Sequence, residues 1–336
     1  MTRSPTLALA GDVMLGRLVN ESLGDADFAR PWGDVLPTLR QADLFFVNLE
    51  CALTARTERW VDGGPKAFYF RGEPRVVAAL QAARVDGVSL ANNHIGDFGP
   101  DGLRDTIAVL DRAGIAHAGA GIDRWSAREP ALVTRLGLRV ALLAWADYPA
   151  EWAATPHDAG LNYTPVSVAP EHFDEVKLAL SLARDRADIV VFSIHWGPNM
   201  RARPTPEFRT FAHAVIEAGA DVFWGHSAHV VQGAEWWGKG LILYDTGDLL
   251  DDYAVDPHLR NDLSALFLVR VTPPVVDGVE VVPVRIADMR VNLARGADRE
   301  WFIRRYDARC AEVGTRLATQ PGPLVLTPAS RAATAV

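Results

Sequence analysis

Short apolar runs alternate along the chain with longer stretches in which apolar residues recur at helical spacing. Most of the short runs end at Gly, Asp, Asn or His, which is typical of buried strands that lead into loops. The longer stretches are typical of amphipathic helices, and one of them begins after Pro100 and ends before Gly114. The pattern therefore predicts an α/β protein. The predicted strands are Thr6–Ala10, Leu44–Asn48, Gly87–Leu90, Val140–Trp145, Ile189–Ile194, Asp221–Trp224 and Leu241–Tyr244, and the predicted helices are Glu73–Ala83, Gly102–Ala113, Pro170–Ala187 and Thr205–Ala218.

Two late apolar runs, Leu266–Val271 and Val279–Ile286, are joined by a segment rich in Pro and Gly and predict an antiparallel pair that completes a second sheet. With 336 residues and 49% apolar positions, the chain is long enough to bury one large core. We expect a single domain over residues 1–318. Beyond it the composition turns to Pro, Ala, Thr and Ser, so residues 319–336 are predicted to be a mobile tail.

Composition excludes several classes of protein. The 34 Lys and Arg residues against 42 Asp and Glu give a net charge of -8, whereas a nucleic-acid partner needs a basic face. The two cysteines, Cys51 and Cys310, are too few for a disulfide framework or a thiolate zinc site. No apolar run approaches the roughly 18 residues that span a bilayer, and the first residues lack a secretory signal. We expect a cytoplasmic protein without membrane insertion, and the oligomeric state stays open.

Residues with acid/base or metal-binding side chains follow five of the predicted strands. Since ligands gather outside the carboxyl ends of strands in α/β sheets, these residues are expected to converge in one crevice. Carboxylate and amide oxygens combined with imidazole nitrogens, without thiolate, suit Mn, Fe, Mg or Zn. The sequence therefore predicts a site for one or two divalent ions. Its candidate residues are Asp12, Glu50, Asn92, Asn93, His94, His195, His226 and His229.

At these residues the chain resembles the CapA family of poly-γ-glutamate and capsule synthesis proteins, whose catalytic core is similar to the calcineurin-type metallophosphoesterases. The resemblance implies a calcineurin-like fold, in which a sandwich of two β-sheets is flanked by helices and carries the metal site at one end. It extends in order from about residue 6 to 290. The motifs that carry it are Gly11-Asp12-Val13-Met14-Leu15-Gly16-Arg17, Asn48-Leu49-Glu50, Ala91-Asn92-Asn93-His94 with Asp97 and Gly99, His195-Trp196-Gly197, Gly225-His226-Ser227-Ala228-His229-Val230 and Tyr244-Asp245-Thr246-Gly247-Asp248.

The resemblance also implies roles for individual residues. Asp12, Glu50 and Asn93 match metal ligands, and the three histidines at 195, 226 and 229 match ligands or their near neighbours. His94 matches the catalytic histidine of phosphoesterases, and Asp12 and His229 are further candidates for proton transfer. Four residues are candidate substrate-binding groups. Arg17 and Lys66 could clamp an anion or be ordinary surface cations, and Trp196 could line a peptide groove or pack in the core. Asn92 is the fourth candidate.

The sequence departs from the phosphoesterase pattern in three places. Val13 and Met14 follow Asp12 where a histidine ligand is usual, which favours one tight ion or two unequal ones. Two residues rather than one separate His226 from His229. The chain also begins almost directly with its first strand, whereas membrane-attached capsule proteins carry an anchor, so export of a polymer is not expected. An acidic stretch follows the predicted strand Leu241–Tyr244 and contains Asp245, Asp248, Asp251 and Asp252. These side chains could bind a cation or orient a histidine, but a solvated loop is favoured for them.

These residues suit several functions. The favoured one is a metal-dependent enzyme, hydrolytic or biosynthetic, that acts on a peptide or γ-glutamyl amide. A second is a peptide epimerase that removes the Cα proton and returns one. This alternative is based on a metal-dependent lasso-peptide epimerase that looks like a member of the same superfamily. A phosphoesterase rests on analogy of fold alone. A domain that binds polyglutamate or a peptide without turning it over is the alternative outside enzymology.

Overall fold

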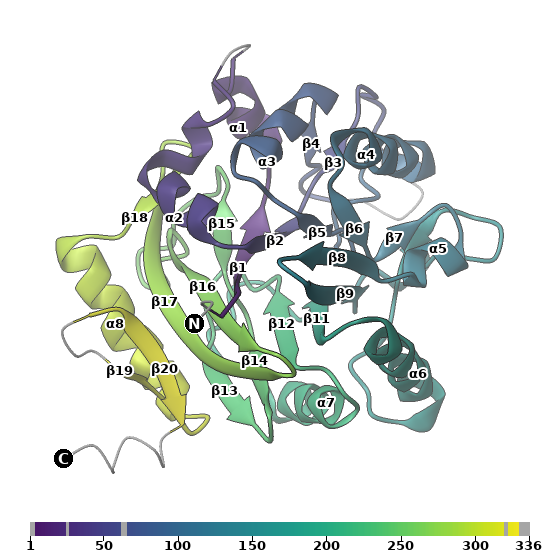
Figure 1. Cartoon of the computed structure of the whole chain (residues 1–336). Helices are drawn as coiled ribbons and strands as arrows, with labels where there is room; N and C mark the ends of the chain where they lie inside the picture. The colour runs from purple at the N-terminus through teal and green to yellow at the C-terminus, as the bar shows by residue number, and fades with distance from the viewer. Residues whose placement is uncertain (1–3, 25–26, 62–65, 319–321, 329–336) are drawn as a thin grey trace, which may run out of the picture.

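The computed structural model describes residues 4–24, 27–61, 66–318 and 322–328, and within them it forms two large sheets (Figure 1). The first sheet has ten strands, in the order β19 (Thr315–Ala318), β20 (Leu324–Pro328), β17 (Val275–Ala287), β16 (Leu263–Thr272), β1 (Thr6–Val13), β2 (Leu44–Leu49), β5 (Gly87–Ser89) and β6 (Ala116–Ala118), with β15 (Asp248–Leu250) beside β1 and β18 (Arg290–Leu293) beside β17. The second has six, in the order β13 (Ala234–Trp237), β14 (Gly240–Leu243), β12 (Val222–His226), β11 (Ile189–His195), β9 (Leu138–Ala146) and β8 (Ala131–Arg135).

The remaining elements are short strand pairs and helices. The pairs are β3 (Ala52–Leu53) with β4 (Arg71–Gly72) and β7 (Ala120–Gly121) with β10 (Gly160–Leu161). The helices are α1 (Arg17–Ser22), α2 (Leu36–Gln41), α3 (Val77–Ala82), α4 (Gly99–Ala113), α5 (Arg124–Arg128), α6 (Pro170–Arg186), α7 (Pro206–Glu217) and α8 (Gly296–Ala311), with 3-10 turns η1 (Arg30–Val35), η2 (Pro74–Val76) and η3 (Ala150–Trp152).

The central strands of the second sheet are apolar on both faces, because each face is covered. On β11, Ile189 and Val191 belong to the core between the two sheets, whereas Val190 and Phe192 pack toward α6 and α7. This two-residue period is what a strand buried on both sides requires. Figure 1 shows α6 and α7 outside this sheet, and α3 and α4 outside the first sheet. The α/β class predicted from the sequence is confirmed.

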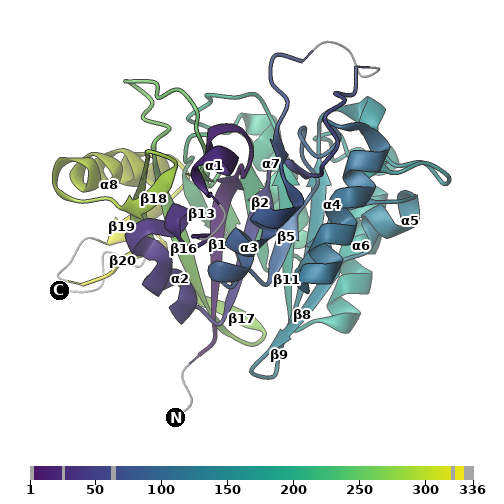
Figure 2. The same ribbon diagram turned by 90° about the horizontal axis from the view of Figure 1, so that it is seen from above.

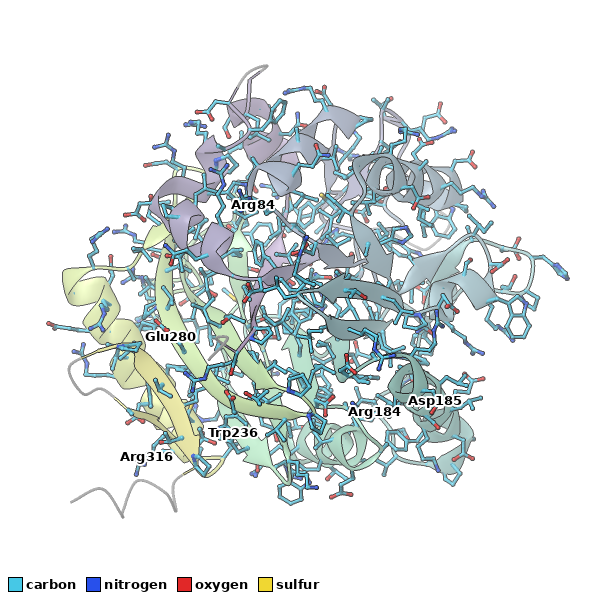
Figure 3. The ribbon with its side chains drawn as sticks, viewed as in Figure 1. Arg84, Arg184, Asp185, Trp236, Glu280 and Arg316 are labelled. Carbon is cyan, nitrogen blue, oxygen red and sulfur yellow. The ribbon has the colours of Figure 1, made fainter. Side chains whose placement is uncertain are left out.

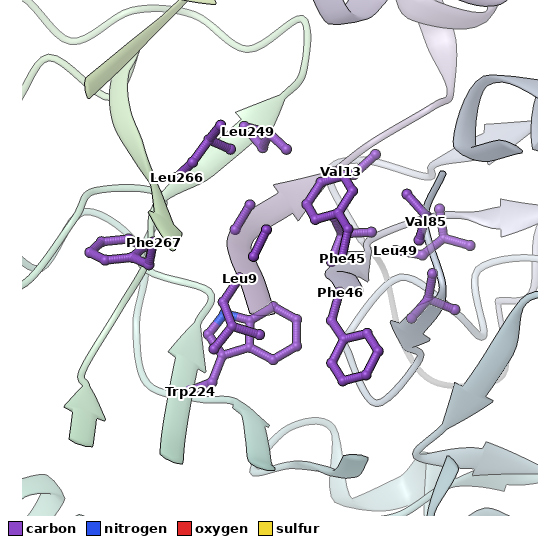
Figure 4. Close-up of a cluster of buried hydrophobic side chains, with 14 of the residues drawn as sticks. Leu9, Val13, Phe45, Phe46, Leu49, Val85, Trp224, Leu249, Leu266 and Phe267 are labelled. Carbon is purple, nitrogen blue, oxygen red and sulfur yellow. The ribbon is translucent and has the colours of Figure 1, made fainter. Parts of the chain in front are cut away.

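The core between the sheets is built from large side chains of both. Figure 4 shows Leu9 of β1, Phe46 of β2 and Trp224 of β12 among them, and all three are fully buried. Charged side chains away from the site lie mostly at the surface, and Figure 3 shows Asp185 on α6 and Arg316 on β19 at the periphery. Because both sheets contribute to one core, the position of one sheet's edge is fixed relative to the other's.

Parallel pairing brings the carboxyl ends of the central strands to common edges. β1, β2 and β5 are parallel neighbours, as are β9, β11, β12 and β14. In Figure 2, β1 runs upward from the N-terminal end of the chain, toward the side on which α1 lies. The loops that carry the motifs therefore leave both sheets at one end of the molecule.

The late antiparallel pair exists as β16 and β17, but it extends the sheet of β1 rather than completing the other one, because β16 pairs with β1 over Thr6–Leu9. The predicted tail also needs correction. Residues 324–328 form β20, which pairs with β17 and β19 and buries Leu324 and Leu326. Residues 319–321 and 329–336 lie outside the described residues. Within the described ranges, no helix combines the length and apolarity needed to cross a bilayer.

Candidate metal centre

Four strands deliver the central residues of the site from their carboxyl ends. Asp12 lies near the end of β1, Glu50 follows β2, and His195 and His226 end β11 and β12 as register partners. A fifth strand, β15, runs parallel to β1 and places Asp248 opposite Asp12. The residues are far apart in sequence, so their meeting depends on the packing of the two sheets.

Gly11 allows β1 to approach the segment before β15. The amide of Asp12 donates to the Gly247 carbonyl at 2.9 Å, and a Cβ at residue 11 would lie only 1.6 Å from that carbonyl oxygen. Gly247 itself has φ +66°, a conformation that glycine adopts without strain. These two glycines therefore allow Asp12 and Asp248 to stand side by side.

Gly11→Ala is expected to lower the free energy of unfolding by about 3 kcal/mol, because the backbone at residue 11 and the backbone at Gly247 must move apart to make room for the Cβ. Urea unfolding followed by circular dichroism measures the change. Gly137→Ala is the control, since a Cβ there meets nothing within 4 Å and only the positive φ of +81° opposes it. Equal, small losses in both variants would contradict the close approach.

One donor group consists of Asp12, His195 and His226, whose ligand atoms lie within 4.8 Å of one another. The Nδ1 atoms of the two histidines are 3.0 Å apart, and Nδ1 of His226 is 3.6 Å from Oδ1 of Asp12. The Ser193 hydroxyl lies 2.8 Å from Nε2 of His226. A hydrogen bond at the second ring nitrogen orients an imidazole for a ligand at the first.

The other donor group shares Asp12 and adds Glu50, His229 and Asp248. Nδ1 of His229 lies 2.8 Å from Oδ1 of Asp248 and 3.6 Å from Oδ2 of Asp12. His229 has φ +58° and Ser227 has φ +115°. The two-residue spacing between His226 and His229 is thus accommodated by strained backbone, which is common at functional sites.

Asn48 links Asp12 to the neighbouring loop. Its amide donates to Oδ1 of Asp12 at 2.8 Å and accepts from Asn92 at 3.2 Å. Asn93, from the same loop as Asn92, has a buried Oδ1 without a hydrogen-bond partner among the described residues. Asn48 therefore positions Asp12. Two sequence signals pointed to it, its place at a strand end and the Asn48-Leu49-Glu50 motif.

The site has donor atoms that the described residues leave unsatisfied. Such groups are rare in folded proteins, and an unseen ion is one explanation for them. Burial, together with the charge of Glu50, raises the pKa of Asp12 well above its usual range, and burial raises that of Glu50 to about 7. A divalent cation would neutralise these carboxylates, so the residues present fit a metal. The unpartnered atoms are Asp12 Oδ2, Glu50 Oε1, Asn93 Oδ1, His195 Nε2 and Asp248 Oδ2.

His94 stands beside the donor groups and is held by its own partners. Its Nδ1 lies 2.7 Å from Oδ2 of Asp97, and its ring stacks on Phe70 with centroids 3.8 Å apart. Lys66 forms an ion pair with Asp97 and donates to the Asn93 carbonyl. Burial lowers the pKa of His94 to about 4. The ring is therefore neutral near pH 7, with Nε2 as the nitrogen free to accept a proton.

The pKa of His229 is shifted in the opposite direction. Burial lowers its pKa, but the carboxylates of Asp248, Glu50 and Asp12 outweigh this effect and raise it well above the usual value. Tyr253 packs edge-on against His229 at 5.2 Å, and its hydroxyl donates to Glu50 at 3.0 Å. The site thus has two imidazoles whose pKa values are shifted in opposite directions, His94 downward and His229 upward.

Both of these histidines line one cavity of about 320 Å³. Arg17 lies at its edge, with the guanidinium 3.3 Å from Asp252 and above the ring of Phe70. A volume of this size suits one residue-sized group. The lining residues are Arg17, Phe68, Phe70, His94, Asn199, Met200, His229, Tyr253, Ala254 and Asn261.

The structure does not support substrate-binding roles for Asn92 and Trp196. The Asn92 side chain is buried and bonds to Asn48, to the Leu49 carbonyl and to the backbone of His94. The Trp196 indole donates to the Tyr244 carbonyl and is packed in the helix-side core. The ammonium of Lys66 is engaged with Asp97 and Asn93, so it supports the loop instead of standing free for an anion.

The acidic stretch after β14 is not the solvated loop expected from the sequence. Asp248 belongs to a donor group, and Asp245 accepts hydrogen bonds at 2.8 Å from the backbone of Ala228 and Gly247. Asp251 is buried, and Asp252 binds the backbone of Leu18 and the side chain of Arg17. The acidic side chains recur here because they build and brace the site.

The fold and the site together define an α/β protein that carries a candidate metal centre of oxygen and imidazole donors where two sheets meet. The sequence model of the bacterial capsule synthesis protein family PGA_cap matches residues 6–253, and the chain belongs to this family.

Curated relatives cover most of the chain. A probable polyglutamine synthesis accessory protein of Mycobacterium tuberculosis H37Rv is 33% identical, over 95% of this chain and 95% of its own. The capsule biosynthesis protein CapA of Bacillus anthracis is 27% identical, over 84% of this chain and 68% of its own. The PGA biosynthesis protein CapA of Bacillus subtilis is 26% identical, over 83% of this chain and 73% of its own.

Proposed function

We propose that this protein is a metal-dependent enzyme that acts on an amide of peptide or γ-glutamyl material, in a step of capsule or poly-γ-glutamate synthesis. One observation carries the proposal: possible ligand atoms from five distant segments meet around Asp12. Asp12, Glu50, His195 and Asp248 each have a buried atom among them without a hydrogen-bond partner in the described residues. The family and the names of the relatives support the polymer. The two donor groups suit one or two ions of Mn, Zn, Fe or Mg, with Asp12 common to both.

A divalent ion bound by these groups would supply Lewis acidity toward an amide carbonyl. The residues of the chain supply the rest. Asn48 fixes the carboxylate of Asp12, and Ser193 fixes the ring of His226. His94, whose Nδ1 is held by Asp97, can take a proton at Nε2 and return it to the leaving nitrogen, as a general base and then acid.

A specific observation also favours epimerisation as a second function. Two histidine–carboxylate pairs, His94 with Asp97 and His229 with Asp248, face the same cavity from different elements. One imidazole that removes a Cα proton and another that returns a proton from a different direction would invert the carbon. The neutral state of His94 suits removal, and in this function His229 donates the returning proton and does not bind the ion.

The decisive experiment incubates Mn²⁺-loaded protein with γ-glutamyl dipeptides and ordinary peptides in deuterated water, followed by mass spectrometry and chiral analysis. Addition of water to give two fragments supports hydrolysis, and one deuterium at Cα with inversion supports epimerisation. A substrate panel that stays unchanged while metal is bound would contradict both and favour a binding protein. Turnover confined to a phosphate ester would instead support the phosphoesterase alternative.

Metal binding is expected to stabilise the fold. At an ion concentration 100 times the dissociation constant, a single site that exists only in the folded state adds about 2.7 kcal/mol. Thermal unfolding in EDTA and in excess Mn²⁺ should therefore differ in midpoint by several degrees. Identical midpoints in EDTA and Mn²⁺, with Mg²⁺ and Zn²⁺ equally without effect, would count against a site at these residues.

A further inference from the structure

The two carboxylate oxygens of Glu50 have different surroundings. Oε2 accepts a hydrogen bond of 3.0 Å from the hydroxyl of Tyr253. Oε1 is buried, has no hydrogen-bond partner among the described residues, and lies 3.6 Å from Nε2 of His195, which is likewise buried and unpartnered. Carboxylate oxygen and imidazole nitrogen are both metal ligands. One oxygen of Glu50 is thus engaged by the protein, and the other is left for an ion.

Tyr253 is held in place by contacts of its own. Its backbone amide donates to Oδ1 of Asp251 at 2.8 Å. Its ring stacks on Phe70 with centroids 5.5 Å apart and packs edge-on against His229 at 5.2 Å. Because backbone and ring are both fixed, the hydroxyl is directed at Glu50 by the fold itself.

A hydrogen bond to one oxygen restricts the carboxylate of Glu50. The terminal torsion of a glutamate side chain is broad, so an unrestrained carboxylate can turn either oxygen toward an ion or turn away from it. Holding one oxygen in advance reduces the freedom that is lost when an ion binds. In metal sites, loss of a hydrogen bond to a ligand typically lowers metal affinity by roughly 10- to 100-fold.

We infer that Tyr253 is a positioning residue of the candidate metal centre, where its hydroxyl holds Glu50 so that Oε1 faces the ion. The inference rests on the proposed function and deepens it, because it adds a residue that acts through a candidate ligand. Tyr253 lies outside the motifs singled out in the sequence, and its role follows from the hydrogen bond to Glu50 and from the unpartnered Oε1.

Tyr253→Phe tests the inference, because it removes the hydroxyl and keeps the ring that stacks on Phe70 and packs against His229. We expect the dissociation constant for Mn²⁺, measured by isothermal titration, to rise about 10-fold or more. The visible absorption of the Co²⁺-loaded protein should change as well, since it follows the arrangement of the ligands. A merely structural role would lower the thermal midpoint in EDTA without changing either of these readouts.

Tyr244→Phe is the matched control. The hydroxyl of Tyr244 also donates to a buried glutamate, Glu235, at 2.6 Å, and neither residue belongs to a donor group. This variant loses a hydrogen bond of the same kind, so the thermal midpoint in EDTA should fall by a similar amount. Its dissociation constant for Mn²⁺ and its Co²⁺ spectrum should remain those of the unmodified protein.

Unchanged Mn²⁺ affinity and an unchanged Co²⁺ spectrum in Tyr253→Phe would overturn the inference and leave the proposed function standing. Equal weakening of Mn²⁺ binding in both variants would overturn it too, because the effect would then not depend on Glu50. An unmodified protein that binds neither ion would contradict the metal centre and the inference together. Normal metal binding without turnover of any amide would count against the proposed function alone.

Discussion

Replacing Asp12 with Asn is expected to remove bound metal from both donor groups and to lower turnover by about 100-fold or more. Asp12 is the member that the two groups share, so no other single substitution is expected to affect both so directly. The neutral amide keeps the shape of the carboxylate, and the fold should survive. Metal content by inductively coupled plasma mass spectrometry and turnover measure the two effects.

Asp221→Asn is the matched control for this variant. Asp221 immediately precedes β12, at the end of that strand opposite His226, where it pairs with Arg184. The control should keep metal and turnover, although it loses an ion pair. An Asp12→Asn protein that retained its full metal content would contradict the shared role of Asp12.

His94→Gln is expected to separate chemistry from metal binding. Turnover should fall by about 100-fold or more, the usual scale for loss of an acid/base group, while metal content stays unchanged. The reason is positional, since His94 lines the cavity and belongs to neither donor group. Steady-state kinetics and metal analysis on the same preparation distinguish the two effects.

His213→Gln provides a close control for His94→Gln. His213 also lies near a carboxylate, with Nε2 3.1 Å from Glu235, and also stacks on an aromatic ring, that of Trp237, at 3.6 Å. It lies outside the cavity, so its loss should leave turnover unchanged. Equal turnover in the two variants, whether high or low, would show that His94 has no special role in the chemistry.

The sequence predicted the elements whose pattern is local. All seven predicted strands are confirmed, and the helix expected to end before Gly114 ends at Ala113, with Gly114 in the left-handed conformation. The helix α8 was missed, although Phe302, Tyr306 and Cys310 repeat at intervals of four residues and are buried. Charged residues between them obscured that signal, and burial against β16, β17 and β19 compensates.

The site was predictable where a strand led directly to a functional side chain. Asp12, Glu50, His195 and His226 meet as expected because parallel strands share a carboxyl edge. Asp248 was named only as a possible cation ligand in a stretch expected to be a solvated loop, because its position depends on a short strand that pairs with β1 far away in sequence.

Asn92 and Trp196 were predicted to contact the substrate, and the structure does not support this role for either of them. Both stand next to functional residues in sequence, yet their side chains face the interior, where Asn92 braces a loop and Trp196 fills the helix-side core. Neighbouring residues on a strand or loop point in different directions, so adjacency in sequence does not imply a place in the site.

The most direct test of the account is anomalous diffraction from crystals grown with Mn²⁺. The account predicts one or two anomalous peaks within coordinating distance of the Asp12 carboxylate, bounded by His195 and His226 on one side and by Glu50, His229 and Asp248 on the other. Crystals that contain Mn²⁺ at other positions but show no peak at Asp12 would contradict it.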